Sequence, residues 1–364
     1  MKKCPYCDFH SLEVQSAFPE EEYLSALRSD LESALPLIWG RKIDTVFIGG
    51  GTPSLLSSGG LDQLLSFVRA LVPLDPLAEI TLEANPGAVE AEKFASYRAS
   101  GINRLSIGVQ SFNDTHLQAL GRIHSGDDAR RAIELAQRNF ENFNLDLMYA
   151  LPDQTIEQAR QDIATAIGFA PPHLSVYQLT LEANTYFAKN PPNLPDEDTI
   201  AEMQEMVEEM TLAAGYLHYE VSAYAQPGRQ ARHNLNYWHF GDYVGIGAGA
   251  HSKISFPQRI VRQSRHKQPK AYIERARAGL AVMEEQEVTR DDLVFEFMLN
   301  ALRLNQGFET RLFSERTGLP ITYIEKILQK AEAKGLIKRD HKAIAPTEFG
   351  RRFLIDLQQM FLTD

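Results

Sequence analysis

The sequence predicts an α/β protein, in which a partial barrel of parallel strands and helices precedes a small helical domain. Helical runs alternate with short β-branched segments from residue 20 to about 221, which is the pattern of βα units around a parallel sheet. The periodicity is lost from Gln226 to about Pro269, and helical patterns return beyond Thr289. This order indicates one large domain and a smaller second one.

The barrel elements are justified by apolar periodicity and by helix caps. Residues 20–35 place Tyr23, Leu24, Leu27, Leu31 and Leu35 on one helical face. Strands are expected at 45–48, 80–82, 104–107, 143–145, 174–177 and 217–219. Two of the helices between them are expected to open on capping boxes, Ser125 with Asp128 and Thr155 with Gln158.

The C-terminal part predicts a winged-helix-like domain. Helices are expected at 291–304, 309–317 and 320–333, with a hairpin formed by 335–337 and 343–345. The aromatic and histidine-rich segment before it is expected to be a functional insertion or a barrel-closing strand with loops. We therefore expect three parts: a barrel over 1–225, an extension that closes it over 226–285, and the winged-helix-like domain over 286–364.

Composition and charge exclude several classes of protein. No apolar run approaches the roughly 18 residues that a membrane-spanning helix needs, and the N-terminal lysines are not followed by the apolar stretch of a secretory signal. We therefore expect a cytoplasmic protein. A net charge of −11 argues against a general nucleic-acid binder. Two cysteines in 364 residues exclude a disulfide framework.

Polar residues and glycines follow the carboxyl ends of five expected strands. They are Gly49 to Pro53, Glu83, Gln110, Asp146 and Gln178. In a parallel barrel these ends form one rim where ligands collect, while apolar side chains fill the strand interiors. Individually, Asp146 could cap a loop and Glu83 could begin a turn. Their common register favours a shared site, although the glycine run lacks the spacing of a dinucleotide or phosphate loop.

Both cysteines lie in Cys4-Pro5-Tyr6-Cys7, a pattern with three interpretations. A thioredoxin-type redox pair would follow a strand and open a helix, which is not the context here. Zinc would need a second pair of ligands, and none is visible. An iron-sulfur site needs at least three thiolates, and this sequence supplies two.

Taken together, the motifs resemble those of the radical S-adenosylmethionine (radical SAM) superfamily. Cys-Pro-Tyr-Cys-Asp-Phe is followed by Phe-Ile-Gly-Gly-Gly-Thr-Pro-Ser, Glu-Ala-Asn-Pro-Gly, Ser-Ile-Gly-Val-Gln-Ser-Phe and Asn-Leu-Asp-Leu-Met-Tyr-Ala-Leu-Pro. The resemblance covers essentially the whole chain and is strongest to the HemW haem chaperones, which are related to oxygen-independent coproporphyrinogen III oxidase. Asp8-Phe9 after the cysteines and His-Asn-x-x-Tyr-Trp from His233 favour HemW over the oxidase.

This resemblance implies a partial (β/α)6 radical SAM barrel, its cofactors and its site residues. The cofactors would be a [4Fe-4S] cluster on Cys4 and Cys7, S-adenosylmethionine, and haem with His233 as a contact. Gly50, Gly51 and Thr52 would bind the methionyl end of S-adenosylmethionine. Its amine, carboxylate and ribose hydroxyls would be held by Glu83, Gln110, Arg122 and Asp146. Carboxylates and a bidentate guanidinium suit those groups.

The N-terminus departs from the resembled pattern, Cys-x₃-Cys-x₂-Cys preceded by a first barrel strand. The residue four before Cys4 would be position 0, so we expect an N-terminally truncated chain that lacks the first cysteine and the first strand. A mis-assigned start accounts for this more simply than genuine loss. The ligand set is then incomplete, which leaves radical catalysis open.

The sequence is compatible with three functions. The leading one is a haem chaperone that delivers haem to respiratory proteins, with a homodimer and peripheral membrane association left open. The alternative is oxidative decarboxylation by an oxygen-independent coproporphyrinogen III oxidase. A nucleic-acid regulator ranks last, because acidic and basic residues nearly balance in the winged-helix-like domain.

Histidines and methionines also have plain structural interpretations. His233 and His239 could belong to a packed aromatic corner. Met203, Met206 and Met210 share one helical face and are expected in the core.

Overall fold

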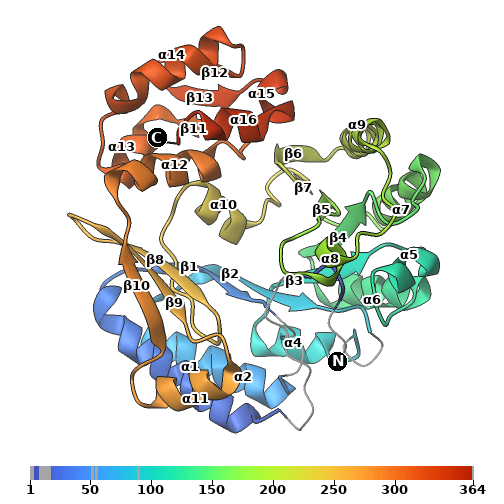
Figure 1. Cartoon of the computed structure of the whole chain (residues 1–364). Helices are drawn as coiled ribbons and strands as arrows, with labels where there is room; N and C mark the ends of the chain where they lie inside the picture. The colour runs from blue at the N-terminus through green and yellow to red at the C-terminus, as the bar shows by residue number, and fades with distance from the viewer. Residues whose placement is uncertain (1–3, 8–17, 51–52, 54–55, 88–90, 363–364) are drawn as a thin grey trace. The chain divides into compact units, whose positions relative to one another are not determined.

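The structure is a computed structural model that describes residues 4–7, 18–50, 53, 56–87 and 91–362 (Figure 1). The chain divides into two compact units. Unit 1 comprises residues 1–28, 40–218 and 222–230, and unit 2 comprises residues 29–39, 219–221 and 231–364.

Unit 1 is built on a seven-stranded sheet with the order β1-β2-β3-β4-β5-β7-β6. The strands β1 to β5 pair in parallel, and β7 pairs antiparallel with β5. Their bounds are β1 Ile43–Ile48, β2 Leu74–Ala84, β3 Arg104–Gln110, β4 Phe143–Tyr149, β5 His173–Gln178, β6 Leu217–Glu220 and β7 Ala223–Ala225. Each strand was expected from the sequence except β7, so the predicted α/β partial barrel is confirmed.

The helices of unit 1 alternate with these strands along the chain (Figure 1). They are α1 Glu20–Ala34, which continues into unit 2, α2 Ser58–Leu71, α4 Phe94–Ser100, α5 Asp114–Ala119, α6 Gly126–Asn139, α7 Ile156–Gly168, α8 Tyr186–Lys189 and α9 Glu197–Ala213. Both predicted capping boxes form, at Ser125 with Asp128 and at Thr155 with Gln158. Because parallel crossovers are right-handed, strands in sequential order place their connecting helices on the same face of the sheet.

The two faces of this sheet differ in chemistry. Leu105, Ile107 and Val109 of β3 alternate with Arg104 and Ser106, and β4 and β5 alternate in the same way. The apolar set packs toward the helices, while the polar set shares the opposite, inner face. The expectation of an apolar strand interior was therefore wrong: Asn144 donates a hydrogen bond to Ser106 between neighbouring strands, and Arg104 forms an ion pair with Glu79, so these polar groups have partners inside the sheet.

Unit 2 contains a three-stranded antiparallel sheet in a region where the sequence predicted loops. Its order is β10-β9-β8, with β8 His251–Ser255, β9 Ile260–Arg265 and β10 Val282–Glu287. Two helices flank it in sequence, α10 Arg232–Trp238 and α11 Pro269–Arg277. The strands carry buried Lys253, Gln263 and Arg265, so the apolar alternation that identifies a strand is interrupted by charged and amide groups.

A buried ion pair anchors this sheet to the end of α1 and to α11 within unit 2. The Oδ1 atom of Asp30 accepts a hydrogen bond from Arg265 Nε at 3.3 Å. Its Oδ2 atom accepts hydrogen bonds from Tyr272 Oη at 2.9 Å and from Gly247 N at 3.3 Å. Arg265 Nη1 also donates to Ser252 Oγ at 2.7 Å. Both charges are thus paired and hydrogen-bonded, as buried charges require.

The C-terminal part of unit 2 has the predicted helices and hairpin around a small core. The helices are α12 Arg290–Ala301, α13 Thr310–Thr317, the short 3₁₀ helix η3 Ile321–Ile324, α14 Glu325–Ala333, α15 Glu348–Arg352 and α16 Leu354–Gln359. The sheet order is β11-β13-β12, with β11 Phe308–Glu309, β12 Ile337–Arg339 and β13 Ala343–Pro346. Phe297 meets Phe240, Phe308 and Phe313 edge-on at the centre of this core. Among the described residues, no helix combines the length and apolar character that crossing a membrane requires.

Candidate functional site

The rim of unit 1 begins where β1 and β2 end side by side. Gly50 N donates a hydrogen bond to Glu83 Oε2 at 3.0 Å. A Cβ atom on Gly49 would lie 2.9 Å from the Glu83 carboxyl group, so this close approach requires glycine. Burial raises the pKa of Glu83 to about 7, with a further contribution from the negative charge of Asp146 and partial opposition from the Gly50 N–H. Gly51 and Thr52, which were expected to share this site, lie outside the described residues.

Gln110 ends β3 in a left-handed conformation, with a φ of 66°. This backbone turn is uncommon for a residue with a side chain. The buried Gln110 accepts a hydrogen bond at Oε1 from Tyr177 Oη at 3.0 Å. The turn therefore directs the side-chain amide of Gln110 toward the inner face of the sheet, where Tyr177 of β5 is its hydrogen-bond partner.

Arg122 connects the end of β3 with the cysteine turn. Its Nη2 atom donates to Gly108 O at 2.8 Å and to Asn85 Oδ1 at 3.1 Å. Its Nη1 atom lies 3.9 Å from Cys4 Sγ. This contact places the guanidinium beside the cysteine turn.

The turn from Cys4 to Cys7 is held against unit 1 by backbone contacts. It closes through a hydrogen bond from Cys7 N to Cys4 O at 3.2 Å, and Pro5 O accepts another from Phe187 N at 3.0 Å. Gly121 has a φ of 68°, and a Cβ atom there would lie 2.8 Å from Pro5 Cδ. Neither cysteine forms a disulfide, and both are partly exposed. The two thiols are thereby placed at the carboxyl end of the sheet.

Asp146 lies on the inner face, one pleat below this rim. Its Oδ1 atom accepts a hydrogen bond from Asn144 Nδ2 at 2.7 Å, and its Oδ2 atom accepts one from Ser106 Oγ at 3.1 Å. Burial raises the pKa of Asp146, while the hydrogen bonds from Asn144 and Ser106 act in the opposite direction. The carboxylate is thus a firmly held acceptor.

Five of the expected rim residues therefore gather in one unit: Gly50, Glu83, Gln110, Arg122 and Asp146. Cys4 lies beside them through its contact with Arg122. Gln178, in contrast, is exposed, and its neighbour Tyr177 takes the inward position. The two-residue period of β5 could have identified Tyr177, since it shares a face with His173 and Ser175. Asn85, which accepts a hydrogen bond from Arg122, was also missed.

The described residues do not contain a complete metal site of protein ligands. No group of three or more histidine, cysteine, aspartate or glutamate side chains lies close enough together there to hold a metal ion. The turn from Cys4 to Cys7 carries two free thiols.

The His233 motif forms α10 in unit 2, away from the strand ends in sequence, and its members pack within that unit. His233 is buried, at 9% exposed. Asn236 Nδ2 donates to Asp242 O at 2.9 Å. Tyr237 meets Tyr243 edge-on at 4.8 Å between ring centroids. The guanidinium of Arg303 covers one face of Trp238 at 4.3 Å from the ring centroid.

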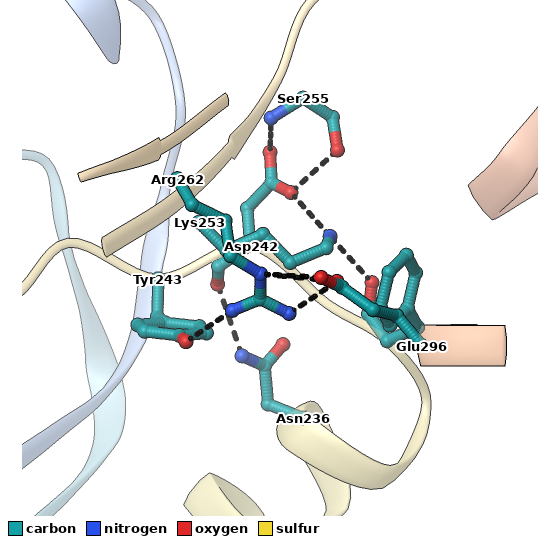
Figure 2. A network of polar contacts seen from close by, with 8 residues as sticks. Asn236, Asp242, Tyr243, Lys253, Ser255, Arg262 and Glu296 are labelled. Carbon is teal, nitrogen blue, oxygen red and sulfur yellow. Dashed lines mark hydrogen bonds and ion pairs between the residues drawn. The ribbon is translucent and has the colours of Figure 1, made fainter. Parts of the chain in front are cut away.

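A polar network supports α10 from the neighbouring strands (Figure 2). Arg262 donates to both carboxylate oxygens of Glu296 and, through Nη1, to Tyr243 Oη at 3.0 Å. Lys253 Nζ donates to Asp242 Oδ1 at 3.2 Å. Burial alone would raise the pKa of Asp242, but hydrogen bonds from Ser255 and the charge of Lys253 bring it below its usual value.

Comparison with known proteins identifies similar sequences along the whole chain. Residues 1–166 match the radical SAM superfamily, and residues 288–353 match the HemN C-terminal domain. The heme chaperone HemW of Escherichia coli (strain K12) is 45% identical over 366 residues, covering 100% of this chain and 96% of that protein. The heme chaperone HemW of Bacillus subtilis (strain 168) is 36% identical over 357 residues, covering 96% and 93%.

A solved structure shares the fold. Coproporphyrinogen III oxidase (HemN) from Escherichia coli, a radical SAM enzyme, superposes with a TM-score of 0.84 at 24% sequence identity. The match covers 100% of this chain and 87% of that chain. At this identity the likeness is one of fold.

Proposed function

This chain belongs to the HemW family of haem chaperones within the radical SAM superfamily, and from that membership we propose that it binds haem and delivers it to haem-accepting respiratory proteins. The observation that carries the proposal is similarity over the full length to relatives named as heme chaperones, at 45% identity to one of them. The likeness to coproporphyrinogen III oxidase is one of fold at 24% identity, so porphyrinogen decarboxylation is the less supported function.

The radical SAM family implies a [4Fe-4S] cluster and S-adenosylmethionine, which together supply one-electron chemistry when bound. We propose that S-adenosylmethionine binds at the rim of unit 1. The donor and acceptor set there fits the molecule: Glu83 and Asp146 offer carboxylate acceptors for an amine and hydroxyls. Arg122 offers a guanidinium for a carboxylate. Gly50, with Gly51 and Thr52 beside it in sequence, would adjoin the methionyl end.

The cluster fits the described residues only in part. Cys4 and Cys7 are the cysteines of this sequence, whereas the Cys-x₃-Cys-x₂-Cys pattern of the superfamily supplies three thiolates to its cluster. We propose that these two thiols are cluster ligands and derive no reaction step through the cluster.

The haem site is proposed in unit 2 around His233. An imidazole can ligate haem iron, and aromatic side chains such as Tyr237 can pack on a porphyrin face. His233 and Tyr237 lie on the same short helix, α10, which the network in Figure 2 holds against its neighbours. Axial ligation would require His233 to reach the iron from a position that is 9% exposed.

Two further proposals complete this function. A cytoplasmic location is supported by the paired cysteines in a metal-binding pattern, since that compartment keeps thiols reduced. The division into a barrel over 1–225, an extension over 226–285 and a domain over 286–364 is supported by the C-terminal family match to residues 288–353.

Titration of haemin into the whole chain, followed by the Soret band, tests the haem proposal. The chain and a control variant, His341→Ala on an exposed histidine, should bind with the same affinity. His233→Ala and the bulkier His233→Gln should bind more weakly and lose the band of a histidine-ligated haem. Equal binding by all four proteins would remove His233 from the site, and a Soret band unchanged from free haemin in every case would overturn haem binding.

A further inference from the structure

The residue that supports Asp146 is itself supported by a buried histidine. Asn144 is 1% exposed and His173 is fully buried. The Nδ1 atom of His173 lies 2.6 Å from Asn144 Oδ1. Neither residue reaches the rim, and neither was singled out in the sequence.

The hydrogen bonds of this group run in one direction. The Oδ1 atom of Asn144 can only accept, so His173 carries its proton on Nδ1. Ser175 Oγ donates to the same oxygen at 3.1 Å. Asn144 Nδ2 then donates to Asp146 Oδ1 at 2.7 Å and to Ser106 Oγ at 2.8 Å. Ser106 Oγ in turn donates a hydrogen bond to Asp146 Oδ2 at 3.1 Å.

The orientation of the Asn144 amide depends on His173. Rotation of the amide by half a turn would place Oδ1 against the Asp146 carboxylate and the NH₂ group against the Nδ1–H of His173. Both contacts would be repulsive, so the Asp146 carboxylate, which only accepts, and the Nδ1–H tautomer of His173 together hold the one orientation in which Asn144 donates to Asp146.

Strand register explains why these residues meet. Ser106 pairs with Asn144, and Asn144 pairs with His173, in one row across β3, β4 and β5. One pleat nearer the rim, Asp146 pairs with Ser175. Because inward-facing residues recur every second position, the row beneath the rim supports the row that forms it.

The hydrogen bonds from the protein leave acceptor positions on the Asp146 carboxylate free for a ligand. Asn144 and Ser106 each occupy one acceptor position, on different carboxylate oxygens. The Ser175 hydroxyl lies within reach of both this carboxylate and Asn144 Oδ1, and when its proton goes to Asn144 each carboxylate oxygen keeps one position for a ligand. Two neighbouring hydroxyls, as in a ribose, match two oxygens held at a fixed angle. The donors also stabilise the ionised carboxylate against burial, which on its own raises the pKa of Asp146.

On this basis, and resting on the proposed S-adenosylmethionine site, we propose that His173 and Asn144 are positioning residues that hold the Asp146 carboxylate to receive the two hydroxyls of a ribose. The residues act through Asp146 and do not touch the ligand.

Calorimetric binding of 5′-methylthioadenosine and its 3′-deoxy analogue to the whole chain tests this role. The probe carries the ribose but neither the amine nor the carboxylate, so it reports on Asp146. His173→Phe should bind the ribose probe about tenfold more weakly, as expected for one misdirected hydrogen-bond acceptor. It should also lose most of the preference over the deoxy analogue. His173→Asn keeps an N–H near the Nδ1 position and should restore most of the affinity.

A double-mutant cycle with Asp146→Ala separates positioning from general damage. His173→Phe should cause no further loss of affinity in the Asp146→Ala background. An equal loss in both backgrounds, or no recovery with His173→Asn, would overturn the positioning role. Loss on Asp146→Ala with full affinity in His173→Phe would overturn it as well.

Two further outcomes complete the test. Full affinity in Asp146→Ala would overturn the proposed S-adenosylmethionine site, and the positioning role with it. If His173→Phe fails to fold, Asn144→Ala removes the donor to Asp146 Oδ1 and should weaken the ribose probe about tenfold. Unchanged affinity in that variant would count against the role.

Discussion

Arg265 Nε lies 3.3 Å from Asp30 Oδ1, and the two side chains are 1% and 0% exposed. The pair joins residues 235 positions apart in the chain. Within unit 2 it ties the last turns of α1 to β9, and Tyr272 Oη adds α11 through its bond to the same carboxylate. Three segments therefore depend on one buried negative charge.

Replacement of Asp30 by alanine should lower the free energy of unfolding by about 3 to 5 kcal/mol, because it leaves the Arg265 guanidinium buried without its counter-charge. Urea denaturation followed by circular dichroism measures the change. Asp127→Ala removes an exposed ion pair with Arg130 and should change stability by less than about 1 kcal/mol. Similar small losses in both variants would show that Asp30 is not needed for the folded unit.

Asp146→Ala and Glu83→Ala should each weaken S-adenosylmethionine binding by about 1 to 3 kcal/mol, because each leaves ligand hydroxyl or amine groups without a charged partner. Isothermal calorimetry measures the loss, and Glu157→Ala, on the exposed first turn of α7, is the matched control. Folding should be little affected. Unchanged affinity in both rim variants would remove the assignment of this site.

Binding of S-adenosylmethionine should weaken as the pH falls from about 8 to about 6, because the pKa of Glu83 is raised to about 7. The carboxylate is ionised above that pH and loses its charge below it. The same pKa shift affects folding in the opposite direction. Between pH 7 and the ordinary carboxyl pKa of 4.5, the folded state binds the proton more readily than the unfolded state, so the stability of the folded state increases as the pH falls through this range. Glu83→Gln, whose side chain does not titrate, should bind with a flatter pH profile. An identical profile in both proteins would assign the titration to another group.

Iron bound to a chain of this sequence should be labile, because Cys4 and Cys7 supply two thiolates where the Cys-x₃-Cys-x₂-Cys pattern supplies three. Iron and sulfide analysis after anaerobic reconstitution and desalting checks this, with Cys4→Ser/Cys7→Ser as the control that should retain none. About four irons and four sulfides per chain, stable to desalting, would contradict the expectation.

The barrel could be predicted from the sequence because its signals are local. Apolar periodicity located α1, and the capping boxes at Ser125 and Thr155 marked the starts of α6 and α7. Of the three methionines expected in the core, Met203 and Met206 are 0% and 5% exposed, whereas Met210 is only partly buried. The sheet of β8, β9 and β10 was missed, because Lys253 and Arg265 are buried through partners distant in the sequence, and no local pattern reveals such pairing.

The site, like the fold, has features that local sequence signals predict and features that depend on long-range pairing. The strand-end positions of Glu83 and Asp146 follow from strand order, so the rim could be anticipated. Its supporting contacts depend on register between strands: Ser106 meets Asn144, and Asn144 meets His173, only once β3, β4 and β5 are aligned. Gln178 was expected to follow the strand at the rim but is exposed, because β5 extends through Gln178 and the two-residue period of the strand places this side chain on the face opposite to Tyr177.

The turn at Cys4 has a consequence for the rate at which metal is taken up. Its backbone is closed by the bond from Cys7 N, and it is fastened to a second segment by the bond from Phe187 N to Pro5 O. A flexible loop that closes only when an ion binds loses chain entropy during binding. The turn from Cys4 to Cys7 is already closed in the folded protein, so its entropy is lost during folding instead. Capture of iron by the two thiols should then be limited by ion delivery and by displacement of its water ligands. Bulk at position 121, where a Cβ atom would press on Pro5, would slow uptake without altering either sulfur.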